Sequence, residues 1–133
     1  MKLTRAASYA IHALSYMAGQ KHNKPVASHL VAQARGIPER FLLKVLKPLV
    51  SARVLQSIKG PNGGYRLAKG PNEITLLEIL EAVDGPIRGA GSFSREETDG
   101  ALNKRLDNIC CQVAEAMRKH LGKVKLTELV TKD

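Results

Sequence analysis

Apolar residues recur every three or four positions in several stretches of the chain, which is the spacing of a helix with one buried face. Four such stretches cover residues 3–18, 26–34, 38–49 and 76–84, and a fifth covers residues 101–121. The fifth would extend roughly 30 Å as a helix, at about 1.5 Å per residue. Between residues 54 and 67 the pattern changes to two short β-prone runs separated by glycines. The chain is therefore predicted to be mostly α, with one β-hairpin.

The first two predicted helices supply part of a small core. The first would bury Leu3, Ala6, Ala10, Leu14 and Met17, and the second would bury Val26, Ala27, Leu30, Val31 and Ala34. Only Arg35-Gly36-Ile37 separates the second helix from the third. Gly36 can take the left-handed conformation that often ends a helix, and Pro38 suits the first position of the next.

The third helix has two chemically distinct faces. Leu42, Val45, Leu46 and Leu49 would point inward, which leaves Glu39, Arg40, Lys44 and Lys47 pointing outward. We expect Pro48 to bend or end this helix, because proline lacks the backbone N–H that the helix needs. Two short helices joined by a three-residue turn predict a helix-turn-helix, whose second helix enters the DNA major groove.

The β-prone runs behind this motif predict a hairpin. Residues 54–59 form the first run, 60–64 the turn and 65–67 the return. Proline, asparagine and glycine in the turn supply the backbone conformations that a tight turn requires. A hairpin in this position is a wing, whose glycines would let the backbone lie close to a phosphate. A nucleotide-binding loop is the alternative, but no helix and no GK[ST] sequence follows the glycines.

Charge is distributed unevenly along the chain. Residues 1–70 contain twelve Lys and Arg against one acidic residue, a net +11, whereas residues 71–133 contain nine against eleven, a net −2. The basic half coincides with the helix-turn-helix and the wing, as expected for a surface that binds phosphates. A basic surface that is merely solvated is the alternative interpretation.

These motifs resemble one family of bacterial winged-helix regulators, which includes the iron–sulfur regulator IscR, the nitric-oxide sensor NsrR and the cysteine-metabolism repressor CymR. The similarity is carried by Gly36-Ile37-Pro38, by Leu42, Leu46 and Leu49, and by the wing sequence from Lys59 to Tyr65. It extends to residues 1–3, 76–85 and 126–129. The resemblance implies a winged-helix domain that binds DNA through its recognition helix and the base of its wing.

Arg40 is the best candidate to read a base, because its guanidinium fork suits guanine. Glu39 would accept a hydrogen bond from a cytosine amine or would cap the helix, and both roles remain open. Lys59 is assigned to phosphate, and Arg5 either contacts phosphate or is solvated. The predicted DNA-binding residues are Arg5, Pro38, Glu39, Arg40, Phe41, Lys44, Lys59, Gly60, Asn62, Gly63, Gly64 and Tyr65.

The longest predicted helix carries an apolar stripe that a single chain would have to cover. Its spacing is close to a heptad seam, formed by Leu102, Leu106, Ile109, Val113 and Met117. Burial of this stripe against a second copy of the chain is the simplest explanation, and packing back onto the same domain is the alternative. In the resembling family this helix forms the dimer interface. The predicted organisation is a winged domain over 1–85, a flexible loop over 86–100, and a dimerisation helix with a docking C-terminal segment over 101–133.

Cluster-binding members of the family present three cysteines before this helix, whereas the chain has only Cys110 and Cys111. Adjacent helical residues point about 100° apart, so both cysteines could address one metal only if the helix began at them or unwound there. The resemblance suggests a [2Fe–2S] site completed by His12 of a second copy, although relatives have a carboxylate where Ser8 stands. The alternative is a pair of cysteines beside the apolar stripe and a His12 without a ligand role.

Composition narrows the functional class. Aromatic residues make up 4% of the chain and tryptophan is absent, which argues against a protein that stacks single-stranded bases. No apolar run approaches the roughly 20 residues of a membrane span. Two cysteines do not form a disulfide framework, so a reducing cytoplasmic compartment is expected. The sequence shows no Ser-His-Asp set and no paired carboxylates that would indicate an enzyme.

We therefore predict a homodimeric, winged helix-turn-helix transcription regulator that binds a pseudo-palindromic operator in double-stranded DNA. Two alternatives remain open. One is an RNA- or ribosome-associated winged helix, and the other is a small thiol or metal redox protein.

Overall fold

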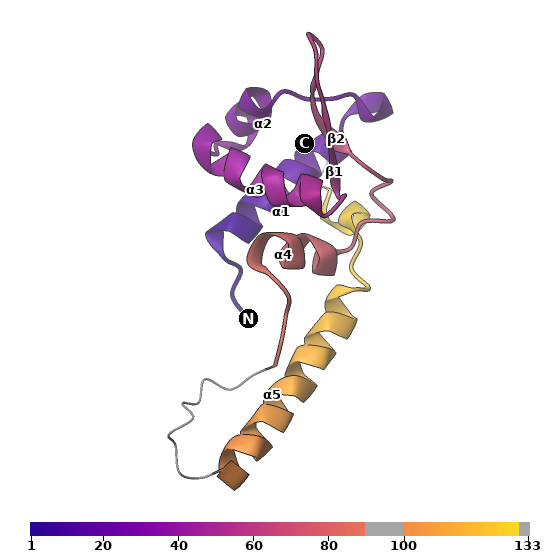
Figure 1. The fold of residues 1–133 in the computed structure, drawn as a ribbon. Coiled ribbons are helices and arrows are strands. Elements are labelled where there is room, and N and C mark those ends of the chain that lie inside the picture. The colour runs from indigo at the N-terminus through magenta and orange to yellow at the C-terminus, as the bar shows by residue number, and fades with distance from the viewer. Residues whose placement is uncertain (90–99, 131–133) are drawn as a thin grey trace.

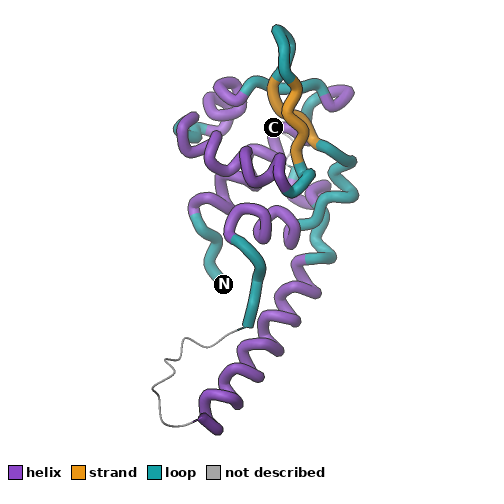
Figure 2. The backbone as a smooth tube through the Cα atoms, in the orientation of Figure 1, coloured by secondary structure: helices purple, strands orange, loops and turns teal. Residues whose placement is uncertain are grey.

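Helix α1 (Arg5–Ala18) forms the centre of the winged domain in the computed structural model, which describes residues 1–89 and 100–130. The α-helices that follow it are α2 (Ser28–Arg35), α3 (Glu39–Ser51), α4 (Leu76–Asp84) and α5 (Gly100–Leu121). Strands β1 (Leu55–Ile58) and β2 (Gly64–Leu67) lie between α3 and α4, and 3₁₀-helices η1 and η2 cover Lys21–Asn23 and Leu126–Leu129. Figures 1 and 2 show the hairpin on one side of the helical core and α5 extending away on the other.

The sequence of α1 explains its central position. Three alanines on its inner face, Ala7, Ala10 and Ala13, are completely buried, and their small side chains let neighbouring helices approach closely. The helix begins at Arg5 and not at Leu3, because Thr4 is the N-cap and its Oγ1 accepts a hydrogen bond from the Ala7 N–H at 3.0 Å. Leu3 lies before the cap and is exposed, so its predicted place in the core is wrong.

Helix α2 also begins later than predicted, at Ser28. Val26 is buried as expected, but it pairs with Tyr65 of β2 as an isolated β-bridge instead of opening the helix. Leu30 and Ala34 were predicted to be inside and are exposed. The helix is short, and Val31 and Ala32 form its buried side.

Helix α3 has the predicted inner face, formed by Leu42, Val45, Leu46 and Leu49. The turn before it also agrees, because Gly36 adopts φ = 64°. The expected effect of Pro48 is wrong, since the helix continues through it to Ser51. Pro48 lies in the last turn, so it removes a single helical hydrogen bond, while the Ala52 N–H still donates to its carbonyl at 2.9 Å.

The wing is an antiparallel hairpin in which Leu55 pairs with Leu67 and Ile58 pairs with Gly64. The inner ends of both strands are anchored in the core, since Leu55 and Leu67 are buried. Together with α1, α2 and α3, this hairpin makes a winged helix-turn-helix domain, as the sequence predicted.

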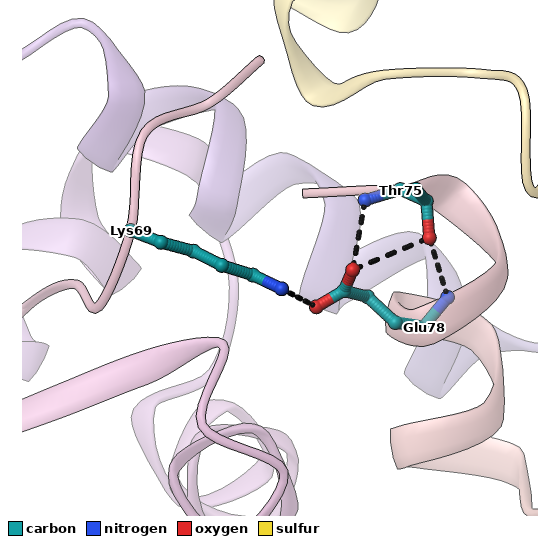
Figure 3. A network of polar contacts seen from close by, with 3 residues as sticks. All are labelled: Lys69, Thr75 and Glu78. Carbon is teal, nitrogen blue, oxygen red and sulfur yellow. Dashed lines mark hydrogen bonds and ion pairs between the residues drawn. The ribbon is translucent and has the colours of Figure 1, made fainter. Parts of the chain in front are cut away.

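A capping box begins α4 and connects it to the end of the wing (Figure 3). The Glu78 N–H donates to Thr75 Oγ1 at 3.1 Å, and the Thr75 N–H donates to Glu78 Oε2 at 3.2 Å. The other oxygen of Glu78 pairs with Lys69 Nζ at 2.8 Å. One carboxylate thus fixes both the start of α4 and the segment that enters it.

The C-terminal segment docks onto the same region, as predicted. The Leu126 N–H donates to the Ile74 carbonyl at 2.8 Å, and the Leu76 N–H donates to the Val124 carbonyl at 2.9 Å. Leu126 is completely buried in the core of the winged domain. Residues 124–130 are therefore part of the winged domain in space, although they follow α5 in sequence.

The C-terminal part of α5 packs on this domain. Met117 and Leu121 join a second apolar cluster with Ala7 of α1 and Leu80 of α4, and Arg118 forms an ion pair with Glu81. Of the predicted loop 86–100, residues 90–99 lie outside the described residues. None of the helices in the described part of the chain is long and apolar enough to cross a membrane.

Candidate nucleic-acid interface

The outward face of α3 carries the charged residues that the sequence predicted there. Glu39, Arg40 and Lys44 are exposed, and Pro38 is exposed at the N-cap instead of occupying the first helical position. The apolar face of the helix is buried and fixes its rotation about its own axis. Glu39 is the single acidic residue among residues 1–70, and the outward face of α3 carries three exposed basic residues beside it, Arg40, Lys44 and Lys47.

Phe41 lies between this charged face and the core and is half-buried. The guanidinium carbon of Arg40 is 4.7 Å from the centroid of its ring, and the Lys44 ammonium nitrogen is 5.6 Å away. A cation at such a distance is attracted by the ring quadrupole by roughly 0.5–1 kcal/mol at an exposed site. Phe41 therefore orients two cations, a role that the sequence did not suggest.

Glu39 connects the two helices of the motif. Its Oε1 accepts a hydrogen bond from Ser28 Oγ, the first residue of α2, at 3.1 Å. Glu39 also lies in the first turn of α3, where a negative charge is favourable because of the helix dipole. The sequence left open whether Glu39 reads a base or caps the helix, and in the structure it links α3 to α2. Ser28 was missed, and its position at a helix start is the signal that could have identified it.

Arg5 and Lys44 come from different helices but lie beside the same hollow. The hollow has a volume of about 210 Å³ and is also lined by Ala6, Tyr9, Phe41 and Val45. Both cationic residues are exposed. The sequence predicted each of them separately, and the packing of α1 against α3 brings them to one surface.

The tip of the wing carries Lys59, Gly60 and Asn62, all exposed. Along the hairpin, Arg66 Nε donates to Gln56 Oε1 at 2.9 Å across the two strands. The wing thus supplies one free lysine at its tip and an arginine held along its side. Lys59 is therefore accessible at the tip, and its predicted contact with a phosphate backbone stays a prediction.

Gly63 and Gly64 have a structural role that the sequence did not reveal. A Cβ atom at Gly63 would collide with the carbonyl of Ile58, and one at Gly64 would collide with the backbone of Val26. Tyr65 follows them and exchanges two backbone hydrogen bonds with Val26, at 2.8 and 2.9 Å. Gly63 thus packs within the hairpin, and Gly64 and Tyr65 hold the wing against the segment just before α2, whereas the backbone position at Gly60 is open.

The predicted metal ligands do not form a site within one chain. His12 is exposed on α1, whereas Cys110 and Cys111 lie in the middle of α5. Because α5 begins at Gly100, neither condition for a shared metal is met: the helix does not begin at the cysteines or unwind there. The Cys111 thiol donates to the Gly89 carbonyl at 2.8 Å. Within residues 1–89 and 100–130, no group of three His, Cys, Asp or Glu side chains could hold a metal ion.

The predicted dimerisation residues divide into two groups. Ile109 and Val113 are 54% and 55% exposed, and Leu102 is exposed as well. Leu106 is half-buried, and Met117 packs on the domain of its own chain. The C-terminal end of the stripe therefore packs back on its own domain and its middle is exposed, so cover of the middle by a second copy stays a prediction.

Residues 3–132 match the model of the Rrf2 family, which is described as an iron-dependent transcriptional regulator. The chain is 34% identical over 124 residues to the protein aau3 of Rhizobium meliloti (strain 1021), covering 92% of the chain and 75% of that protein. It is 31% identical over 132 residues to the HTH-type transcriptional regulator NsrR of Shouchella clausii, covering 98% of the chain and 89% of that protein. It spans only 54% to 64% of the length of three further regulators that are 34–35% identical.

Among solved structures, the chain is similar to CymR, the global cysteine regulator of B. subtilis, with a TM-score of 0.75. The two are 23% identical, and the match covers 98% of this chain and 96% of CymR. At this identity the similarity establishes the fold.

Proposed function

Because the chain belongs to the Rrf2 family of DNA-binding transcriptional regulators, we propose that it binds a pseudo-palindromic duplex operator as a homodimer. Each winged domain would bind one half-site, with α3 in the major groove and the wing along the adjacent backbone. The observation that carries the proposal is the exposed basic face of α3, which Arg5 and the wing flank on the same domain.

Within each half-site, Arg40 is the proposed base reader, since its planar fork can donate two hydrogen bonds to guanine. Its stacking on Phe41 supports this role, because a side chain that is already oriented loses less entropy when it binds. Lys44 and Arg5 would contact phosphates on one side of α3, and Lys59 would contact them at the tip of the wing. Contacts of this second kind give affinity and orientation but read no sequence.

The homodimer would form through the middle of α5. Ile109 and Val113 are one helical turn apart and largely exposed, and such neighbouring apolar residues favour burial against another helix. Two copies related by a two-fold axis would present the same residues to each other. A dimer of this kind would hold two recognition helices at one spacing, which matches a pseudo-palindromic site.

A [2Fe–2S] cluster is a second candidate feature, favoured by the description of the family model as iron-dependent. It would require Cys110 and Cys111 together with His12 of a second copy. The donors fit such a group poorly, because the cysteines lie on a continuous helix and one thiol already donates to a backbone carbonyl. We therefore assign the cluster no part in DNA binding by this chain.

The relatives are transcriptional regulators, and we propose that this chain is likewise a regulator and not an enzyme. Its DNA target implies that it acts in the cytoplasm.

The two alternative functions have less support. An RNA-binding winged helix would have to read an A-form helix, whose deep and narrow major groove does not admit side chains.

The test is to find which genomic DNA fragments the purified protein retains and then to measure its affinity for one of them. Fluorescence anisotropy would compare that duplex with a scrambled duplex and with an RNA hairpin of equal length. We expect specific binding to be at least a thousandfold tighter than binding to the scrambled duplex. Equal affinity for all three ligands, or a preference for the RNA, would refute the proposed function.

A further inference from the structure

We propose that Leu43 is a specificity determinant that contacts the methyl group of a thymine in each half-site. The proposal rests on the proposed function and adds to it an apolar reader beside the polar one. Neither Leu43 nor a thymine contact follows from the charged residues of α3.

Leu43 lies on the part of α3 that faces away from the core. It is 41% exposed, whereas Leu42, its neighbour in sequence, is completely buried. Residues three and four apart lie next to each other on a helix surface, so Leu43 is a neighbour of Glu39, Arg40 and Lys47. All three are exposed. A large apolar side chain thus lies within the charged surface that would enter the major groove.

The side of Leu43 that is turned toward the wing borders a hollow of about 390 Å³ between α3 and the hairpin. Its lining consists of Leu43, Lys47, Val50, Ser51, Ser57 and Tyr65. Ser57 and Tyr65 face each other across the two strands, so the hollow joins the recognition helix to the wing. A duplex bound by both elements would cover this hollow and place base edges against Leu43.

The apolar side chain of Leu43 indicates which base it would contact. The edges of the bases in the major groove are hydrogen-bond donors and acceptors, with one apolar group, the C5 methyl of thymine. A leucine against a donor or acceptor would leave that polar group without a partner, at an unfavourable free energy. A leucine against the methyl group buries apolar surface on both sides. Thymine is therefore the base that fits Leu43.

Exposure alone does not distinguish this leucine, because single exposed apolar residues are common on protein surfaces. Leu30 of α2 is 46% exposed, but the residues three and four positions from it are valine, alanine and glutamine, and none of them is charged. What distinguishes Leu43 is its place among the residues proposed to contact DNA.

The experiment uses the full-length protein and an operator found by fragment retention. Each thymine of the operator is replaced in turn by deoxyuridine, which removes only the methyl group, at the equivalent position in both half-sites. We expect one or two positions at which the wild type loses affinity by about three- to fivefold per half-site, or on the order of tenfold in all. Leu43→Ala should bind the original operator more weakly and should no longer distinguish thymine from uracil at those positions.

Two further variants make the result specific to Leu43. Leu43→Met keeps an apolar side chain of similar reach and should retain the dependence on the methyl group, whereas Leu30→Ala should retain it fully. A wild type that binds its operator specifically but is indifferent to every methyl group would overturn the inference and leave the proposed function intact. A Leu43→Ala variant with unchanged methyl dependence would overturn it as well. If no duplex is bound specifically, the proposed function fails, and this inference fails with it.

Discussion

Replacing Ile109 with alanine should weaken the homodimer by a predictable amount. Burial of a whole isoleucine side chain is worth about 1.5–3 kcal/mol. Because 54% of Ile109 is exposed in the single chain, about half of that free energy, roughly 0.8–1.5 kcal/mol, remains to be gained at an interface. A two-fold interface contains the residue twice, so Ile109→Ala should cost roughly 1.5–3 kcal/mol. The dimer Kd should then rise about 13- to 150-fold.

Analytical ultracentrifugation over a range of protein concentrations measures this Kd directly. Leu30→Ala is the matched control, because it truncates a large apolar residue of similar exposure on α2, outside the proposed interface. Circular dichroism should show the same helix content for both variants and the wild type. At a protein concentration below the new dimer Kd, operator affinity should fall for Ile109→Ala alone. An unchanged dimer Kd in Ile109→Ala would refute the placement of the interface on this face of α5.

Three further predictions concern the DNA surface, the cysteines and the stability of the domain. Arg40→Ala should weaken binding to the specific operator by about 1–3 kcal/mol and relax the sequence preference, whereas Lys59→Ala should weaken binding to all duplexes alike and reduce the slope of log affinity against log salt by about 2 in the dimer. Lys123→Ala, which removes a charge at an exposed position after α5, is the control. Equal behaviour of Arg40→Ala and Lys59→Ala would contradict the assignment of one to a base and the other to a phosphate. The double variant Cys110→Ala/Cys111→Ala should keep the operator affinity of the wild type after anaerobic purification. A cluster would be required if the wild type alone showed visible absorption with bound iron and sulfide and the variant lost DNA binding. Thr75→Ala removes one side of the capping box and should lower the free energy of unfolding by about 1–2 kcal/mol in urea titrations, while Thr127→Ala at an exposed position should have little effect.

Local patterns predicted those elements that local interactions determine. The inner face of α3 follows from the spacing of its apolar residues, and the turn before it follows from Gly36. Each of these signals lies within a few residues of its effect. The exposed positions of Glu39 and Arg40 followed directly, because the rotation of α3 was already determined.

Errors arose where a distant segment decides the outcome. Val26 has an apolar side chain that suits a helix, but Tyr65 pairs with its backbone and keeps it extended. The turn chemistry of the wing did not reveal that Gly64 packs closely on the backbone of Val26, and the assignment of the wing glycines to DNA stays a prediction. Pro48 was expected to bend or end α3, but its place in the last turn limits the loss to one hydrogen bond.

The same reason limited the prediction of the site. Sequence spacing could not show that Arg5 and Lys44 border one hollow, since they are on different helices. It also could not show which part of the long apolar stripe packs back, because Met117 meets α1 and α4 only in three dimensions. The position of Cys111 beside Gly89 depends on the path of residues 86–89, which has no periodic signal.

In the proposed dimer, the contacts between α4 and α5 would determine which operators can be bound. Glu81 of α4 pairs with Arg118 of α5, and this contact helps set the angle at which α5 leaves the domain. At the end of α4, Asp84 accepts a hydrogen bond from Thr4 Oγ1 at 2.8 Å, immediately before Arg5 at the proposed DNA surface. Helix α4 therefore contributes to the orientation of the DNA surface relative to α5. Because half-sites must lie about one helical turn of DNA apart, or a multiple of it, a change in this packing would alter the preferred spacing even if every DNA contact were retained.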